Sequence, residues 1–304
     1  MRIYLSSFLL LYMSCWVFAF DPGKAGFSIE IKGELNPYNI FSVFLLPNEE
    51  AELSSTSVLR VTSEEVGVIK NQNNLWKIKA PIHPGAYSVN ITDLEGNEMR
   101  LNILVLTPIS EKKGEYLNGY RVGNYPIKPL NGNPIYNRPK GLFEVTKENL
   151  NLAVTPHFML RQFLCKQESD FPKYLIIRER LILKLEYLLE KVNENGIPIQ
   201  TFGFISGYRT PYYNKLIKNV AYSRHVYGGA ADIFIDQNGD GYMDDLNKDG
   251  LTNEADVRIF YNVVEQEFGN SDYKNYKGGL GFYKKNQVHK GFIHVDVRGR
   301  RARW

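Results

Sequence analysis

The stretch Ser223-Arg-His-Val-Tyr-Gly-Gly-Ala-Ala-Asp-Ile-Phe-Ile235 combines a tight turn with the start of a β-strand. Two glycines and two alanines separate His225 from Asp232, so the chain can turn sharply there and bring both side chains to one point. The apolar residues that follow predict a strand over 231–235. We therefore expect the second half of the chain to be organised around this turn and strand.

A second segment, Phe292-Ile-His-Val-Asp-Val297, also predicts a strand. Residues two apart on a strand share a face, so His294 and Asp296 are expected to point the same way. Two imidazoles and one carboxylate with an open fourth position are the donor set of a catalytic zinc site. Nitrogen donors favour zinc over calcium or magnesium. The composition alone leaves a structural role for each histidine open.

The pattern around these strands is mixed α and β from about residue 143 to residue 304. A further strand is predicted over 197–205, where Ile-Pro-Ile-Gln-Thr-Phe-Gly-Phe-Ile follows an Asn-Gly helix stop. Helices are predicted over 157–165, 174–193 and 256–268. The expected fold of this part is an α+β domain whose functional residues lie on or beside strands.

Residues 24–107 are predicted to be all-β. Alternation of apolar and polar residues marks strands over 27–32, 75–79 and 87–91, and the apolar run over 40–46 predicts a core strand. Several short strands at this spacing predict an immunoglobulin-like β-sandwich, which we interpret as a binding or spacer module. Residues 108–142 are rich in Gly, Pro, Asn and Tyr and are predicted to be a linker that packs on its neighbours.

The N-terminus has the features of a secretory signal peptide over residues 1–19. Arg2 precedes an apolar run, and Val17 and Ala19 supply the small residues of a cleavage site. An uncleaved anchor is the alternative, although the run is short for a bilayer span. We expect a periplasmic or secreted protein that is not held in the membrane after cleavage.

Charge and cysteine content exclude several classes. The formal net charge is only +4, and no nucleic-acid-binding motif is present in the sequence, so nucleic acid is not an expected partner. Cys165 is the one cysteine left after cleavage, which excludes an internal disulfide. It lies in an amphipathic stretch without an evident activating base, so a buried structural thiol is favoured over a nucleophile. A Gly-x-Ser-x-Gly nucleophile elbow is also missing from the sequence.

Three ordered blocks resemble one known family. They are Phe204-Ile-Ser-Gly-Tyr-Arg-Thr-Pro211, the run Ser223-x-His-x-x-Gly-x-Ala-x-Asp232, and His294-x-Asp296. Together they resemble the zinc D-alanyl-D-alanine carboxypeptidases and related muramyl endopeptidases, over about residues 150–304.

The resemblance implies a small antiparallel sheet flanked by helices, as in the hedgehog/DD-peptidase fold. It implies that His225, Asp232 and His294 bind zinc, and that Arg209 binds the substrate carboxylate or the developing oxyanion, with Ser223 nearby in the substrate site. The expected activity is metal-assisted hydrolysis of peptidoglycan peptides.

One position departs from the family pattern. Many members carry an acidic general base three residues before the last zinc histidine, where this chain has Gly291. His289 and Asp296 are the remaining candidates for a catalytic base, although Asp296 also fits a residue that orients a ligand histidine. The alternative function is a non-catalytic, zinc-stabilised module that binds the cell wall, because fold alone does not decide activity.

Residues 236–256 form an acidic insertion with the spacing of calcium loops. Oxygen side chains at loop positions 1, 3 and 5 with glycine at position 6 are what an EF-hand loop requires, and the pattern resembles the loops of dockerin modules. A solvated acidic loop with Asn-Gly turns is the alternative. The expected calcium ligands, in two overlapping registers, are Asp236, Asn238, Asp240, Tyr242, Asp245, Asn247, Asp249, Leu251, Asn253 and Asp256.

Overall fold

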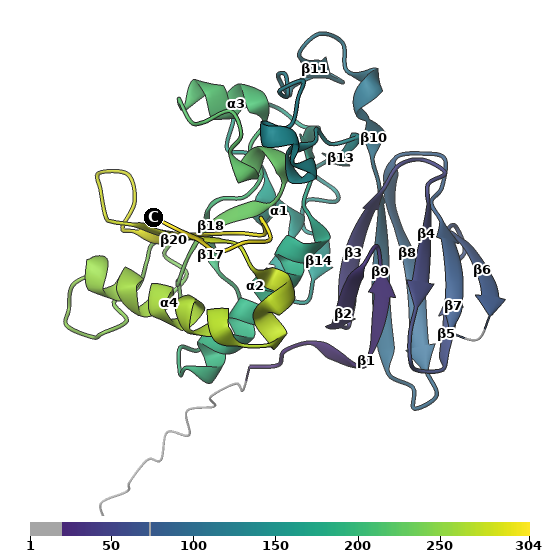
Figure 1. The fold of residues 1–304 in the computed structure, drawn as a ribbon, viewed down its shortest axis with the longest axis horizontal. Helices are drawn as coiled ribbons and strands as arrows, with labels where there is room; N and C mark the ends of the chain where they lie inside the picture. The colour runs from purple at the N-terminus through teal and green to yellow at the C-terminus, as the bar shows by residue number, and fades with distance from the viewer. Residues whose placement is uncertain (1–19, 73) are drawn as a thin grey trace, which may run out of the picture.

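The computed structural model describes residues 20–72 and 74–304. The predicted signal peptide lies outside the described residues. In the described part, no helix has both the length and the apolar character that a bilayer span requires. Figure 1 shows an all-β region beside a mixed region that follows it in the chain.

The N-terminal region consists of two β-sheets, with strand orders β2-β1-β4-β7-β6 and β3-β9-β8-β5. All strand pairs in it are antiparallel except β3 with β9, which are parallel. Alternate side chains, such as Ile29 on one sheet and Ile103 on the other, are fully buried and belong to one core. The all-β expectation for this region is confirmed. The strands are β1 (Lys24–Ile31), β2 (Glu34–Tyr38), β3 (Ile40–Leu45), β4 (Glu50–Ser54), β5 (Leu59–Thr62), β6 (Gly67–Gln72), β7 (Leu75–Lys79), β8 (Gly85–Asp93) and β9 (Glu98–Val105).

The segment predicted as a linker contains short ordered elements that pack on both neighbours. Leu117, Tyr120 and Val122 are buried in the common core. The carbonyl of Val122 accepts a hydrogen bond from the N–H of Tyr212 in the mixed region. The elements are β10 (Thr107–Pro108), η1 (Ile109–Glu111), β11 (Tyr116–Leu117), β12 (Tyr120–Arg121), η2 (Leu130–Gly132) and η3 (Pro134–Tyr136).

The mixed region is built on a sheet of order β17-β18-β20-β19-β21, in which only the edge pair β19 and β21 is parallel. Helix α4 contacts β19 and β20, and α2 contacts α4. In Figure 1, α4 lies along the sheet that contains the strands labelled β17, β18 and β20. The remaining strands and helices are β13 (Gly141–Val145), β14 (Ala153–Thr155), β15 (Phe158–Met159), α1 (Leu160–Phe163), β16 (Lys173–Leu175), α2 (Glu179–Glu194), β17 (Gly203–Ser206), α3 (Pro211–Leu216), η4 (Arg224–Tyr227), β18 (Ala230–Phe234), α4 (Glu254–Gln266), η5 (Glu267–Gly269), η6 (Asp272–Tyr276), β19 (Gly279–Tyr283), β20 (Phe292–Asp296) and β21 (Ala302–Arg303).

Several sequence-based boundaries were wrong. The predicted helix over 157–165 shrinks to Leu160–Phe163, because the apolar spacing there reflects burial of separate side chains rather than one helical face. The predicted helix over 174–193 begins only at Glu179, because Lys173–Leu175 pairs with β13 as a strand. The predicted strand over 197–205 begins only at Gly203.

Helix α2 joins the two regions. Its apolar positions recur at helical spacing, for example Leu181, Leu185 and Leu188, and all are buried. Its acidic residues bind the all-β region: Glu179 lies 2.6 Å from the Lys32 ammonium, and Glu190 lies 2.7 Å from that of Lys24. The all-β region is therefore fixed against the helix that supports the mixed region.

His157 is expected to make the stability of the protein depend on pH. Its Nδ1 lies 2.7 Å from the Glu186 carboxylate and its Nε2 lies 3.0 Å from the Asp21 carbonyl oxygen. Both partners only accept hydrogen bonds, so the folded state favours the doubly protonated ring. Burial lowers the pKa of His157, but the hydrogen bond and the charge of Glu186 outweigh burial and raise it above its usual value.

Because the pKa of His157 is higher in the folded state, its protonation stabilises the folded protein. This stabilisation is fully present below the unfolded-state pKa of about 6.5 and is lost as the pH rises through the folded-state pKa. Urea unfolding of the wild type and His157→Gln at about pH 5.5 and about pH 8.5 measures this, since Gln does not titrate. We expect the advantage of the wild type, on the order of 1.5–3 kcal/mol for a charged hydrogen bond, to shrink at the higher pH. If the difference in unfolding free energy between the wild type and His157→Gln is the same at both pH values, His157 does not have a raised pKa in the folded state.

Candidate metal centre

The turn before β18 requires glycine at position 228. Gly228 has φ of 65°, and a Cβ there would lie 2.3 Å from the carbonyl oxygen of Ile176. A Cβ on Gly229 would lie 2.5 Å from Nη2 of Arg224. The chain can therefore leave the short helix η4 and enter β18 at Ala230 within two residues, which brings His225 over the strand.

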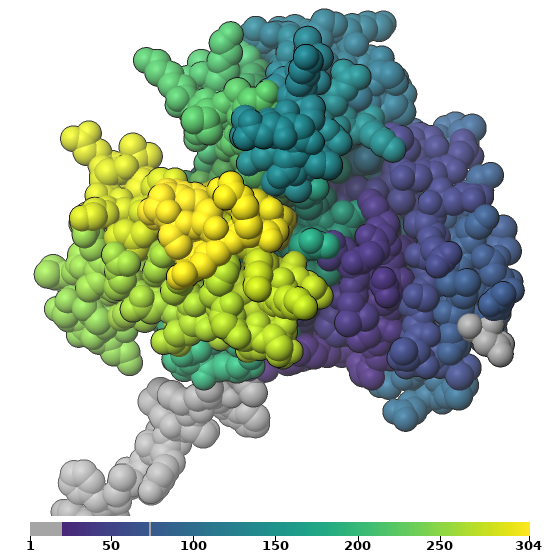
Figure 2. All heavy atoms as spheres, viewed as in Figure 1, coloured from purple at the N-terminus to yellow at the C-terminus, as the bar shows by residue number. Residues whose placement is uncertain are grey.

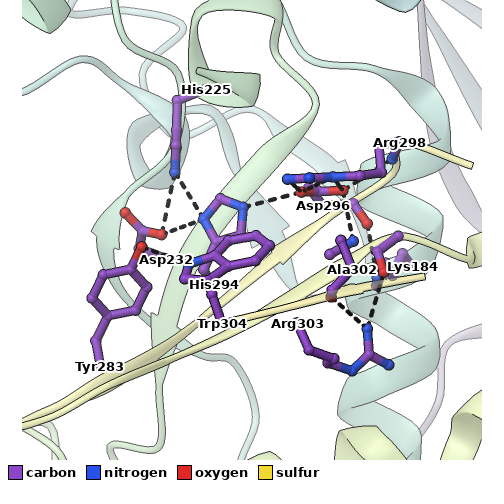
Figure 3. Close-up of polar contacts among 12 residues, drawn as sticks. Lys184, His225, Asp232, Tyr283, His294, Asp296, Arg298, Ala302, Arg303 and Trp304 are labelled. Atoms are coloured by element: carbon purple, nitrogen blue, oxygen red, sulfur yellow. Dashed lines mark hydrogen bonds and ion pairs between the residues drawn. The ribbon is translucent and has the colours of Figure 1, made fainter. Parts of the chain in front are cut away.

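Strand register then places the other two predicted ligands. Asp232 on β18 is directly opposite His294 on β20. His225 Nε2 lies 3.2 Å from Asp232 Oδ1 and 3.2 Å from His294 Nδ1, and His294 Nδ1 lies 2.8 Å from Asp232 Oδ1. All three residues are buried, and Figure 3 shows them converging from the helix and the two strands.

The outer hydrogen bonds of the two histidines fix which ring nitrogen is free. His225 Nδ1 lies 2.7 Å from the Gly207 carbonyl oxygen, which can only accept, so this nitrogen carries the proton. His294 Nε2 faces the Asp296 carboxylate at 3.3 Å and is the protonated nitrogen by the same argument. In the neutral rings, His225 Nε2 and His294 Nδ1 then present lone pairs toward each other and toward Asp232 Oδ1. Three acceptors in mutual contact repel unless a metal ion or a proton lies between them.

The spacing of the three atoms fits a metal ion. Ligands at about 2.0–2.2 Å around a tetrahedral zinc ion lie roughly 3.3–3.6 Å apart, a few tenths of an ångström more than observed here. Among residues 20–72 and 74–304, this is the one group of His, Cys, Asp or Glu donors found close enough to share an ion. The structure therefore contains a buried His-Asp-His group that can hold a metal ion.

A proton on His294 is the competitor of a metal ion. Burial lowers the pKa of His294, but hydrogen bonds to Asp232 and Asp296 outweigh burial and raise it. Burial likewise raises the pKa of Asp232, but the charge and hydrogen bond of His225 and the contacts of His294 hold it well below its usual range. Burial lowers the pKa of His225. Asp232 is thus ionised and His225 neutral, as metal binding requires. His294 becomes neutral, and able to bind a metal, when it loses one proton.

Asp296 holds His294 in place and does not face solvent. Its side chain is fully buried. Its carboxylate accepts hydrogen bonds from the Gly279 N–H at 2.8 Å and from Arg298 Nε at 2.8 Å, besides its contact with His294. A carboxylate enclosed in this way orients a ligand histidine, so we correct the expectation that Asp296 serves as a catalytic base.

A cavity of about 1030 Å³ opens beside the three ligands. Arg209, Ser223 and His289, which the sequence singled out, all line it. Its walls also include Leu130, Tyr136, Tyr222, Tyr283, Arg298 and Trp304. The predicted linker thus contributes directly to the cavity. In Figure 2 the teal linker residues and the yellow C-terminal residues adjoin on one face of the molecule.

Arg209 contacts one of the ligands. Its Nη2 lies 2.5 Å from Asp232 Oδ2, and its Nε donates to Ser206 Oγ at 2.8 Å. The ion pair uses the oxygen of Asp232 that the histidines leave free. Arg209 is only 8% exposed, so the pairing fixes the carboxylate with little screening by solvent.

The structure around Gly291 leaves no room for the acidic residue that many members of the resembled family carry at this position. Gly291 has φ of 113°, and a Cβ there would lie 2.5 Å from Cγ2 of Val257. A glutamate or aspartate does not fit at this position without moving α4. His289 remains the candidate base because it lines the cavity. Its Nε2 accepts a hydrogen bond from Asn286 Nδ2 at 2.9 Å, so the neutral ring carries its proton on the buried Nδ1, and uptake of a second proton requires release of the Asn286 hydrogen bond. Burial lowers its pKa, which favours the neutral form that a base requires.

The acidic loop adopts two similar turns. Asp236 Oδ2 accepts from the Gly241 N–H at 3.0 Å, and Asp245 Oδ2 accepts from the Gly250 N–H at 2.7 Å, so positions 1 and 6 of both registers are linked in the same way. Asp256 and Asn253 also cap α4 reciprocally, which accounts for both without an ion. Several of the expected ligands are exposed, and their carboxylates do not converge as the buried group does.

Sequence reasoning missed several residues of the site. Gly207 contributes through its carbonyl, which a sequence does not reveal. Lys184 on α2 is buried and donates to the Asp296 carbonyl at 2.8 Å, beneath the strand that carries His294. Trp304 and Tyr283 could have been suspected from the alternating glycines in Gly278-Gly-Leu-Gly281, which indicate a close approach by another group.

Comparisons of the chain with family models, with curated proteins and with solved structures gave no match. The metal-binding assignment therefore rests on the geometry of the three side chains.

Proposed function

We propose that this protein is a zinc-dependent hydrolase that cuts peptide bonds of peptidoglycan, as a D,D-carboxypeptidase or a muramyl endopeptidase. The observation that carries the proposal is the convergence of three donor atoms, on His225, Asp232 and His294, in the wall of an open cavity. The order of the three sequence blocks supports the peptidoglycan substrate.

Each residue of the site has a separate role in the proposed reaction. A zinc ion held there would lower the pKa of a bound water from about 15.7 to about 7 and polarise the amide carbonyl. Arg209 lines the cavity beside Asp232, so its remaining N–H donors suit a substrate carboxylate or an oxyanion. His289 lines the same cavity and is the candidate for the group that accepts a proton and passes it to the leaving amine. Ser223 adds a hydroxyl to the cavity wall.

The alternative is a zinc-stabilised module that binds the cell wall without cutting it. Gly291 favours it, since no acid stands where many relatives of the motif carry their base. The open cavity favours the enzyme, because a structural zinc site has four protein ligands and is closed. Arg209 in that cavity favours the enzyme as well.

We also propose a fold for each of the two regions and a location for the protein. We assign the mixed region to the hedgehog/DD-peptidase fold and the two-sheet region to an immunoglobulin-like sandwich. A periplasmic or secreted location, reached by cleavage of residues 1–19, would place the enzyme at its substrate.

Digestion of purified muropeptides by the zinc-loaded protein tests the proposal. Mass spectrometry should show loss of a terminal D-alanine or separation of a cross-linked pair. A chelator should abolish the cut, and added zinc should restore it. Binding of muropeptides by the zinc-loaded protein without any cleavage would favour the cell-wall-binding module instead.

Calcium binding by residues 236–256 is a further prediction. Asp245 and Asp249 supply positions 1 and 5 of the second register, and the loop starts four residues after Asp232, so bound calcium should stabilise that end of the strand. At a hundredfold excess over the dissociation constant the stabilisation is about 2.7 kcal/mol. Calcium titrated into zinc-loaded protein should therefore raise the melting temperature of the wild type and not that of Asp245→Ala/Asp249→Ala. An equal rise in both would argue against this loop.

A further inference from the structure

Trp304 packs against the metal centre on the face of the sheet that carries His294. Its indole centre lies 5.1 Å from the ring centre of His294, with 50° between the planes. The indole N–H donates to the Tyr283 hydroxyl at 2.9 Å, and the Trp304 carbonyl accepts from the Phe282 N–H at 2.9 Å. Strand β21 runs parallel to β19 just before it. The position of the ring is thus defined by several independent contacts (Figure 3).

Two glycines of β19 make room for this ring. Gly281 is the direct neighbour of His294 across the strands. A Cβ on Gly281 would lie 2.5 Å from the indole nitrogen, and one on Gly279 would lie 2.8 Å from Cη2 of Trp304. Glycine weakens a strand because it offers no side chain to pack. Two glycines on the same strand face therefore form a slot that the indole fills.

The ring still presents apolar surface to the cavity. Trp304 is 47% exposed, although it is held so firmly, and it lines the cavity together with Tyr283. Tyr283 in turn stacks on Phe292, with ring centres 4.5 Å apart and 9° between the planes. The Arg298 guanidinium lies 5.0 Å from the indole centre. An ordered, half-exposed aromatic pair beside a metal centre is suited to covering an apolar part of a ligand.

We infer that Trp304 and Tyr283 form an aromatic platform that binds the aliphatic side chain of the substrate residue that precedes the one whose carbonyl is attacked. This inference rests on the proposed function. The indole packs against the ring of a metal ligand, so a group lying on it belongs to the residue that carries the reacting carbonyl or to the residue before it, since one residue spans at most about 3.3–3.6 Å. A sugar ring several residues away does not reach the platform.

A lysine-type side chain matches this surface. Its methylene stem can lie along the indole and the phenol while its polar end stays in water. An alanine at the same position leaves both rings uncovered. The platform therefore makes the enzyme prefer a long aliphatic side chain over a methyl group, by about tenfold in affinity.

Two tripeptides that end in two D-alanines test the platform. One carries diacetyl-lysine on the acyl side and the other carries acetyl-alanine. Calorimetry with zinc-free protein measures binding without hydrolysis. Trp304 emission gives a second signal, because Trp76 is 2% exposed inside the all-β region and Trp16 lies in the predicted signal peptide. The wild type should bind the lysyl peptide about tenfold more tightly, with a change in Trp304 emission.

Trp304→Phe should keep most of the preference and Trp304→Ala should lose it. Cobalt binding checks that the metal centre survives each substitution. If Trp304→Ala disturbs cobalt binding, Tyr283→Leu, which removes the other half of the platform, is used to test the preference instead. Equal affinity for the two peptides, lack of binding to either, or a preference that survives both Trp304→Ala and Tyr283→Leu would overturn the platform. A preference in binding with no cleavage by zinc-loaded protein would instead contradict only the proposed function.

Discussion

Replacing His225 with alanine is expected to abolish zinc binding and peptide hydrolysis together. His225 Nε2 is one of only three protein donors in the group, and it lies 3.2 Å from each of the other two donor atoms. Two remaining donors hold zinc too weakly for a catalytic site, which normally has three protein ligands. Metal content after dialysis and turnover of muropeptides measure the two effects separately.

His83→Ala is the matched control, because His83 is an exposed histidine of the all-β region. It should leave zinc content and turnover unchanged. Asp296→Asn should give an intermediate result, since removal of a residue that orients a ligand typically costs about 10–100-fold in metal affinity. Full zinc occupancy in His225→Ala would show that the ion is bound elsewhere.

Arg209→Lys should lower turnover by about a hundredfold to a thousandfold while zinc stays bound. The guanidinium bridges Ser206 Oγ and Asp232 Oδ2, and it lines the cavity at the same time. A lysine ammonium keeps the charge but cannot reproduce this planar, multiple contact. Steady-state kinetics at matched zinc content measures the loss.

Ser206→Ala serves as the control for this substitution. It removes the hydroxyl that accepts from Arg209 Nε but leaves the guanidinium and its ion pair, so only a small loss is expected. If Arg209→Lys has normal kinetics, Arg209 does not act on the substrate. If it loses zinc instead, Arg209 acts through Asp232 alone.

Two of the three ligands, His225 and Asp232, could be predicted because the signals for them are local. His225 and Asp232 are separated by a glycine-containing turn that leads into a strand. This turn brings the two side chains together without a contribution from distant parts of the chain. The pairing of Asp232 with His294 needs the order of strands in the sheet, which no local pattern contains. The sequence suggested that pairing only through the resemblance of its motifs.

Other parts of the site depend on distant pairings and were not predicted. Trp304 reaches His294 because β21 pairs with β19, and Leu130 and Tyr136 reach the cavity because a supposed linker folds back over the mixed region. Apolar periodicity over 157–165 indicated burial correctly but not helix, since a buried irregular segment gives the same pattern.

Anomalous diffraction at the zinc edge from crystals of the zinc-loaded protein tests the central claim most directly. The account predicts one peak within about 2.0–2.2 Å of His225 Nε2, Asp232 Oδ1 and His294 Nδ1, with the fourth position open to the cavity that Arg209 lines. A peak at another place, or a protein side chain in the fourth position, would contradict a catalytic zinc centre at these residues.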